Sequence, residues 1–122
     1  MTDKKLILVA EDDLFNFMYI EEILTTRGFC VLHARTGIEA VKLAQENDGI
    51  IAVLMDIKMP EIDGYEAFTR IRAFNKNIPI IAQTAYALTD EIDKIINHGF
   101  TDVITKPIKV GLFLQKLNKH IN

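Results

Sequence analysis

Short apolar runs that alternate with longer segments of helical period constrain the fold of this chain more than any other feature. The runs are LILVA at 6–10, FCVLHA at 29–34, IIAVLM at 50–55, PIIAQ at 79–83 and DVIT at 102–105. Strands covered on both faces of a parallel sheet have this near-continuous apolar composition. Because parallel strands need right-handed crossovers and a barrel needs eight strands, a doubly wound sheet in the order 2-1-3-4-5 is favoured. We therefore predict one flavodoxin-like (βα)5 domain of class α/β over residues 1–122.

The segments between these runs carry the start and stop signals of helices. The pairs Thr36–Glu39 and Asp63–Glu66 have capping-box spacing, and each precedes a segment of helical period. Gly28 follows a periodic segment at 14–27, as a C-terminal cap does. Two more helices are predicted from apolar residues at helical spacing, which are Leu88, Ile92, Ile95 and Ile96, and then Val110, Phe113, Leu117 and Ile121. No linker or second domain is predicted.

Composition disfavours several classes of protein. The 122 residues are 49% hydrophobic and 25% charged, with a formal net charge of −3 and no basic cluster, so direct nucleic-acid binding is not expected. No apolar run approaches the roughly 18 residues of a membrane span, and the start, MTDKK, lacks a secretory signal. Cys30, the single cysteine, lies in an apolar run and is expected in the core. We expect a cytoplasmic protein without membrane insertion.

Three carboxylates follow the first and third runs. In the predicted order these two strands are neighbours, and the switch point where such sheets bind ligands lies between them. Glu11, Asp12 and Asp56 stand at that point. Converging carboxylates repel one another unless a cation or water compensates their charge, and Mg²⁺ is the cation held by few carboxylates plus water. We therefore expect Mg²⁺ here, while a solvated loop with helix capping by Asp12 or Asp13 stays open.

A hydroxyl and an ammonium group follow the other two strands at this edge. Thr84 comes after the fourth run and Lys106 after the fifth. Catalysis of phosphoryl transfer is mostly positioning and charge compensation, so these groups suit a phosphoryl group on Asp56. A transition metal is disfavoured because the histidines are expected far from the carboxylates. The histidines are His33, His98 and His120.

Taken together, these strand ends resemble the receiver domain of two-component response regulators, a type that also occurs at the ends of hybrid sensor kinases. The resemblance covers essentially the whole chain. It implies that Glu11 and Asp12 are the acidic metal pair and that Asp56 is the phosphoacceptor. It also implies that Thr84 is the switch hydroxyl and Lys106 the invariant lysine.

Two loops extend the resemblance. MPEIDG, from Met59 to Gly64, resembles the loop after the phosphoacceptor, and the family has a cis peptide bond at the position of Lys106–Pro107. The resemblance also implies that the backbone carbonyl of Lys58 is a metal ligand.

The implied donor is a phosphohistidine on a sensor histidine kinase or a histidine phosphotransfer protein. Asp56 would attack the phosphorus with Mg²⁺ bridging the oxygens, and the product would be an acyl phosphate. Thr84 and Lys106 would move towards the new charge and bias an equilibrium between two surface shapes, until water removes the group. The chain would thus catalyse its own phosphorylation and dephosphorylation without being a classical enzyme, and it would signal to a downstream protein.

Some positions near the predicted site depart from the family or vary within it. Val103 stands where receivers usually have an aromatic residue, three before the lysine, so coupling through a rotating ring is not expected. Lys58 and Tyr86 occupy positions from which receivers tune access of the hydrolytic water. We predict that this pair sets the phosphoryl lifetime, with packing of Tyr86 on the fourth helix as the alternative.

The predicted first helix carries a second apolar face. Leu14 and Met18 fall opposite the stripe that includes Ile20 and Leu24, and Phe15 lies at the edge of their face. Exposed apolar side chains beside an active site suggest a docking patch, and receivers bind histidine-bearing helical hairpins there. Scattered surface hydrophobic residues are the alternative.

Three other functions fit the sequence less well. A haloacid-dehalogenase-like phosphatase also uses a strand-end Asp, but it needs a second carboxylate where this chain has Lys58. A flavodoxin-like electron carrier needs a Ser/Thr/Gly-rich loop after the first strand, where Glu11, Asp12 and Asp13 would repel a flavin phosphate. A receiver used only for binding is opposed by the presence of every phosphorylation residue.

Overall fold

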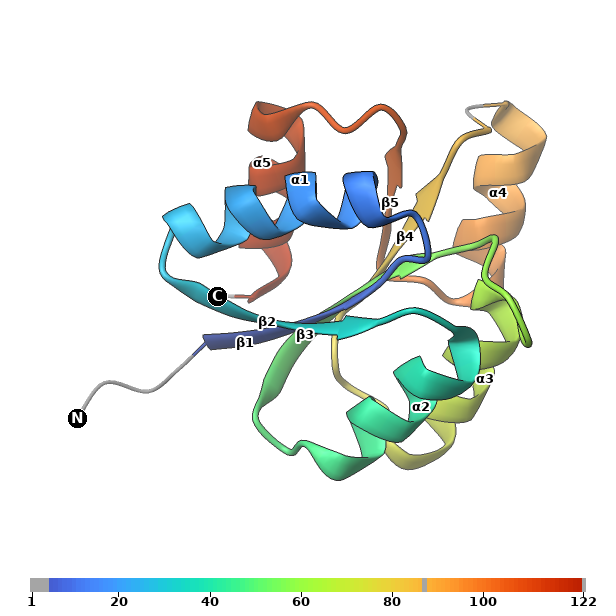
Figure 1. Cartoon of the computed structure of the whole chain (residues 1–122). Helices are drawn as coiled ribbons and strands as arrows, with labels where there is room; N and C mark the ends of the chain where they lie inside the picture. Colours follow the sequence, from blue (N-terminus) through green and yellow to red (C-terminus); the bar gives the residue numbers. More distant parts are fainter. Residues whose placement is uncertain (1–4, 87, 122) are drawn as a thin grey trace.

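Five parallel strands and five helices alternate in the part of the chain that the structure, a computed structural model, describes, residues 5–86 and 88–121 (Figure 1). The strands are β1 (Lys5–Ala10), β2 (Phe29–Ala34), β3 (Ile50–Asp56), β4 (Ile80–Thr84) and β5 (Asp102–Thr105). The helices are α1 (Leu14–Thr26), α2 (Gly37–Glu46), α3 (Gly64–Phe74), α4 (Thr89–His98) and α5 (Val110–Ile121). The sheet has the order β2-β1-β3-β4-β5, so the predicted doubly wound α/β fold is confirmed. That residues 1–122 form one domain stays a prediction.

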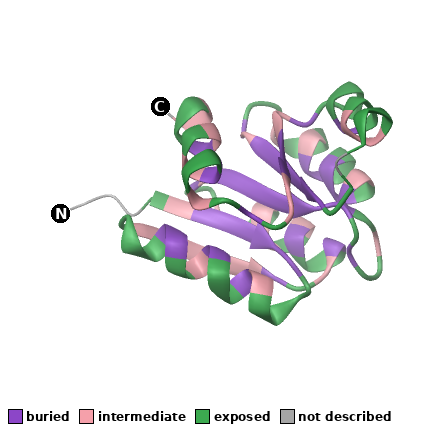
Figure 2. Cartoon of the chain, turned by 90° about the horizontal axis from the view of Figure 1, so that it is seen from above, coloured by how far each residue is buried: buried purple, intermediate pink, exposed green. Residues whose placement is uncertain are grey.

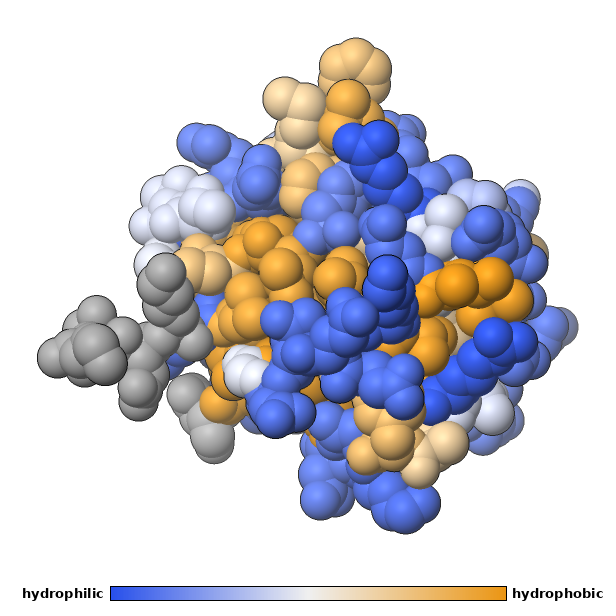
Figure 3. All heavy atoms as spheres, turned by 60° about the horizontal axis from the view of Figure 1, so that its bottom comes forward, coloured by the Kyte–Doolittle hydropathy of each residue, from blue (hydrophilic) through white to orange (hydrophobic). Residues whose placement is uncertain are grey.

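The helices cover the sheet in two layers. α1 and α5 lie on one face, and α2, α3 and α4 pack on the other (Figure 1). Because successive side chains of a strand point to opposite faces, Val53 and Met55 join one core cluster while Ala52 and Leu54 join the other. Figure 2 shows the central strands buried between the helices. In Figure 3, hydrophilic side chains lie beside hydrophobic ones on the side of the molecule that faces the viewer.

Side-chain caps fix where several helices begin. The Thr36 hydroxyl accepts a hydrogen bond from the Glu39 backbone N–H at 3.0 Å, and the Asp63 carboxylate accepts one from Glu66 at 2.9 Å. Both predicted helix starts are therefore confirmed. Asp13 caps α1 through the Asn16 backbone N–H at 3.1 Å, which decides the capping role left open for it. No described helix is both long and apolar enough to cross a lipid bilayer.

Two details differ from the prediction. Cys30 is only partly buried, because β2 lies at the edge of the sheet and pairs with β1 alone, so its predicted place in the core is wrong. β4 runs one residue further than the predicted run, and Thr84 is its last residue rather than the first one after it. The strand starts after Pro79, whose carbonyl still accepts a hydrogen bond from the Val53 N–H at 2.9 Å.

Candidate functional site

The carboxyl edge of the sheet brings the three predicted carboxylates together. Ala10 of β1 pairs with Met55 of β3, so the residues that follow them leave neighbouring strands at the same level. Carboxylate oxygens of Glu11, Asp12 and Asp56 lie within 4.8 Å of one another. Glu11 and Asp56 are buried, whereas Asp12 is exposed and faces the solvent side of the cluster. Hard oxygen ligands in this number suit Mg²⁺ completed by water.

A single cleft of about 460 Å³ is lined by all of the predicted site residues. These are Glu11, Asp12, Asp56, Lys58, Thr84 and Lys106. They reach it from the ends of β1, β3, β4 and β5, which is the reason why residues far apart in the sequence meet here. The topology therefore assembles the site.

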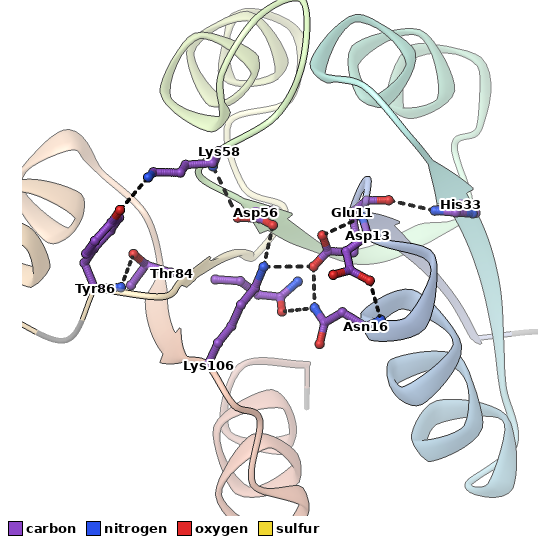
Figure 4. A network of polar contacts seen from close by, with 10 residues as sticks. Glu11, Asp13, Asn16, His33, Asp56, Lys58, Thr84, Tyr86 and Lys106 are labelled. Carbon is purple, nitrogen blue, oxygen red and sulfur yellow. Dashed lines mark hydrogen bonds and ion pairs between the residues drawn. The ribbon is translucent and has the colours of Figure 1, made fainter.

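Lys106 is the cation that lies among the carboxylates (Figure 4). Its Nζ is 2.6 Å from Asp56 Oδ2 and 3.1 Å from Glu11 Oε1. Burial alone would lower the pKa of Lys106, but the contacts with Asp56 and Glu11 raise it above the ordinary value, so the group stays charged. The peptide bond from Lys106 to Pro107 is cis, as the resemblance implies.

Asp56 lies in an environment that disfavours its negative charge. The residue is 4% exposed, and burial raises its pKa from 3.8 to about 6, helped by Glu11 and opposed by Lys106. One ammonium group against three carboxylates leaves an excess of negative charge that a divalent cation would compensate. The donor set and its charge therefore fit the expected Mg²⁺.

The loop after β3 closes tightly beneath Asp56. The backbone N–H of Gly64 donates to the Ile57 carbonyl at 2.8 Å. A Cβ atom at Gly64 would lie 2.5 Å from the carbonyl oxygen of Asp56 and 2.8 Å from Ile57 Cα, and backbone cannot give way as a side chain can. A glycine is required here, which gives the last residue of MPEIDG a physical reason.

Lys58 and Tyr86 meet across the mouth of the cleft. The ammonium Nζ of Lys58 donates to the Tyr86 hydroxyl at 2.6 Å and lies 4.3 Å from the centre of the ring. Tyr86 is 48% exposed, and its backbone N–H donates to Thr84 Oγ1 at 3.1 Å. The two loops that flank the cleft are thus joined by one side-chain contact (Figure 4).

Two polar residues beside Glu11 were missed in the sequence. The Asn16 side-chain amide donates to Glu11 Oε1 and, at 3.2 Å, to Gln83 Oε1. No motif marks Asn16, which looks like an ordinary helix residue. Gln83 did carry a signal, because it is a lone amide at the end of the otherwise apolar run PIIAQ.

One histidine lies closer to the cluster than expected. His33 Nε2 donates to the backbone carbonyl of Glu11 at 2.8 Å, and its ring stacks on Phe17 with 3.5 Å between centres. The expectation that His33 is remote is wrong because β2 pairs with β1 in a register that places His33 opposite Val9. Its ring nonetheless adds no ligand to the carboxylates. The other two histidines lie elsewhere. His98, at the end of α4, contacts the Tyr65 carbonyl of α3, and His120 lies beside Asp102.

A family model described as "Response regulator receiver domain" matches residues 7–118. The chain belongs to this family. Its membership confirms the resemblance and places the receiver domain in two-component signal transduction.

Individual relatives of this receiver domain agree. It is 39% identical to hybrid signal transduction histidine kinase I of Dictyostelium discoideum over 94% of the chain, which spans 7% of that protein's length. It is 29% identical to the polar-differentiation response regulator DivK of Brucella ovis over 96% of each. The family and its fold leave a dehalogenase-like phosphatase or an electron carrier without support.

Solved receiver structures match the fold closely. The receiver domain of the Pseudomonas aeruginosa sensor histidine kinase PA1611 has a TM-score of 0.89 and 35% identity, covering 97% of this chain and 98% of that one. That crystal structure has a magnesium ion coordinated in the active-site cleft. The receiver domain of Ssk1 from Saccharomyces cerevisiae, crystallised with the histidine phosphotransfer protein Ypd1, has a TM-score of 0.89 and 26% identity, covering 99% and 91%.

Proposed function

We propose that Asp56 accepts a phosphoryl group from a phosphohistidine in a reaction that depends on Mg²⁺. The observation that carries the proposal is the Asp56 carboxylate itself, which contacts Lys106 Nζ at 2.6 Å and lies within 4.8 Å of carboxylate oxygens of Glu11 and Asp12. An oxygen of Asp56 forms the new bond to phosphorus as the phosphorus–nitrogen bond to the donor histidine breaks. Lys106 compensates charge on the phosphoryl oxygens. When bound by Glu11, Asp12, Asp56 and the Lys58 carbonyl, Mg²⁺ would add its own positive charge there.

Thr84 would respond to the phosphoryl group. Its hydroxyl, buried at the end of β4, accepts the Tyr86 N–H at 3.1 Å. If this hydroxyl moves to donate to a phosphoryl oxygen, the hydrogen bond from the Tyr86 N–H is lost. The loop that carries Tyr86 would then rearrange. The Thr84 carbonyl also accepts the Lys106 N–H at 2.8 Å, which joins this loop to the one after β5. The switch would then work as a shift between two loop arrangements.

The donor would dock on the exposed face of α1. Leu14, Phe15 and Met18 are 52%, 84% and 53% exposed, although all three are large apolar side chains. They adjoin the acidic cluster, because α1 begins directly after Asp13. An apolar surface of this kind fits a helical partner that presents a phosphohistidine, and the partner of the related Ssk1 receiver is a histidine phosphotransfer protein. We propose a cytoplasmic location together with such a partner.

Labelling with a small acyl phosphate tests the phosphoacceptor. Incubation of the chain with Mg²⁺ and acetyl phosphate should add one phosphoryl group by intact-protein mass spectrometry, and EDTA should prevent it. Asp56→Asn should abolish labelling, whereas Asp48→Asn, at an exposed carboxylate outside the cleft, should not. Undiminished labelling of Asp56→Asn would reject the assignment. Absence of labelling in the wild type would favour a receiver used only for binding.

Docking is tested by comparing two donors. Met18→Glu should slow phosphoryl transfer from a histidine phosphotransfer protein and leave labelling by acetyl phosphate unchanged. Phe74→Glu is the matched control, because Phe74 is 42% exposed but lies at the far end of α3. Equal losses with both donors would place the defect of Met18→Glu in the fold or the chemistry and refute docking at α1.

A further inference from the structure

A pair of amide side chains lies beside Glu11 and has no role in the proposed transfer. Gln83 of β4 is fully buried, and Asn16 in the first turn of α1 is partly buried. The Asn16 amide nitrogen donates both to Glu11 Oε1 and to Gln83 Oε1, the latter at 3.2 Å. Figure 4 shows Asn16 pointing from α1 towards Glu11. A polar chain therefore runs from β4 through α1 to the end of β1.

The contacts of the Glu11 carboxylate indicate what the side chains of Asn16 and Gln83 can do. Oε2 accepts the Asp13 backbone N–H at 3.1 Å, and Oε1 is shared between Asn16 and the ammonium group of Lys106 at 3.1 Å. Lys106 is a rotatable point charge that also contacts Asp56, so it fixes the plane of a carboxylate poorly. Asn16 therefore holds the orientation of Glu11 independently of Lys106.

Among the residues that the structure describes, the Gln83 side chain has a buried amide nitrogen without a hydrogen-bond partner, which should lower the stability of the fold. Within the described residues its Nε2 has no hydrogen-bond partner, although the side chain is 0% exposed. A buried donor without a partner destabilises a folded protein, and methionine or leucine would fill the space without that penalty. The Gln83 contact that would be lost in such a replacement is the one from Oε1 to Asn16. The contribution of Gln83 is therefore to be sought in the position of Asn16.

We propose that Asn16 and Gln83 are positioning residues that hold Glu11 ready to bind Mg²⁺, and that Gln83 acts through Asn16. The inference rests on the metal site of the proposed function and adds two residues that control it. Without the pair, the Glu11 carboxylate keeps, among the described residues, only the Asp13 N–H and Lys106, and the part of its orientation that Asn16 fixed has to be restored when the cation binds, which lowers affinity. Groups that orient metal ligands in this way typically change metal affinity by about tenfold or more.

Calorimetric titration of Mg²⁺ into the metal-free chain tests the pair. Asn16→Ala and Gln83→Met should each weaken Mg²⁺ binding by about tenfold. The double variant should bind no more weakly than Asn16→Ala alone, because Gln83 has no other route to Glu11. Asn47→Ala is the matched control, since Asn47 is also partly buried and donates its amide at 2.8 Å, but to Leu43 at the end of α2. The Mg²⁺ affinity of the Asn47→Ala variant should equal that of the wild type.

Urea unfolding in EDTA separates positioning from a structural role. Gln83→Met should unfold at the same or a higher urea concentration than the wild type, because the unpaired donor is gone. A purely structural role would instead lower this midpoint and leave Mg²⁺ affinity unchanged, and that result would overturn the proposal. Gln83→Leu is a second variant of the same kind, and Asn16→Ala, at a partly buried position outside the sheet, keeps the test valid if neither folds.

Three outcomes separate a failure of the positioning pair from a failure of the proposed metal site. Mg²⁺ binding by all variants as tight as that of the wild type would reject the positioning pair alone, as would losses that simply multiply in the double variant. Failure of the wild type to bind Mg²⁺ would reject the metal site itself, and the pair with it.

Discussion

Replacement of Asp56 by asparagine should stabilise the metal-free protein although it removes the proposed phosphoacceptor. Asp56 is 4% exposed, and its burial raises the pKa from 3.8 to about 6 against the opposing contact with Lys106. Since each pKa unit corresponds to about 1.4 kcal/mol, ionising Asp56 in the folded chain costs about 3 kcal/mol. Asparagine has nearly the same shape. Its single oxygen keeps one of the two hydrogen bonds that Asp56 accepts, from Lys106 Nζ to Oδ2 at 2.6 Å or from the Lys58 N–H to Oδ1 at 3.2 Å, so about 3 kcal/mol is an upper limit to the gain.

The pH dependence follows from the direction of this shift. A folded-state pKa above the ordinary value means that the contribution of Asp56 to stability is full below about pH 3.8 and is lost as the pH rises through about 6. At pH 7.5 Asp56→Asn should therefore exceed the wild type by up to about 3 kcal/mol. Near pH 4 most of that difference should vanish, because the wild-type carboxyl group is then protonated in the folded state.

Urea unfolding followed by circular dichroism measures this difference. With a slope of about 2 kcal/mol per molar urea, the midpoint at pH 7.5 in EDTA should rise by at most roughly 1.5 M in the variant. Mg²⁺ at about 100 times its Kd should stabilise the wild type by about 2.7 kcal/mol and the variant less, so the gap should close. Asp48→Asn, at an exposed carboxylate, should shift little. An equal or lower midpoint for Asp56→Asn in EDTA, or an undiminished gap at pH 4, would refute the reasoning.

Three further outcomes are expected. Gly64→Ala should lower the free energy of unfolding by about 1–3 kcal/mol, because its Cβ would lie 2.5 Å from backbone, while Gly111→Ala in open space should not, and thermal melts compare the two. Asp102→Asn should cost about 1 kcal/mol at pH 7, because it removes the negative charge that faces His120 Nε2 at 2.9 Å and Lys116 Nζ at 3.7 Å. The difference should vanish once the pH falls below the lowered pKa of Asp102, where the wild-type carboxyl group is protonated, and urea curves at both pH values check this. Exchange of Lys58 and Tyr86 for serine should change the rate at which a labelled chain loses its phosphoryl group, and identical decay curves would contradict a role in lifetime.

The fold was predictable because its signals are local. A run such as IIAVLM is apolar at every position, which suits a strand covered on both faces, and the caps at Thr36 and Asp63 follow from a spacing of three residues. The strand order then follows from handedness rules and the number of strands. The prediction that Cys30 is in the core was wrong because its run is apolar although β2 lies at the edge of the sheet. Composition alone does not distinguish an edge strand from a central one.

The site was predictable only as far as the topology carries it. Strand ends of one parallel sheet meet at one edge, so Asp56 and Lys106 were placed together without knowledge of any side-chain conformation. Asn16, Gln83 and His33 depend instead on helix rotation and strand register, which are decided by packing. Gln83 is a polar side chain in an otherwise apolar strand. Such a departure from the hydrophobic pattern often marks a functional position, so it could have been predicted to belong to the site.

The contacts of β5 and of the loop that carries Tyr86 indicate where a signal can leave this receiver. Val103 is 4% exposed in the core and offers no ring to rotate, and its carbonyl accepts Lys116 Nζ at 2.6 Å. Lys116 also lies 3.7 Å from Asp102, so β5 and α5 are tied together by polar contacts in addition to their packing. The β4–α4 connection is held differently, through a side-chain contact between Lys58 and an exposed Tyr86. If the Thr84 hydroxyl moves as proposed, the loop that carries Tyr86 should change conformation more readily than β5 and α5. The downstream partner should therefore bind at the β4–α4 side of the molecule.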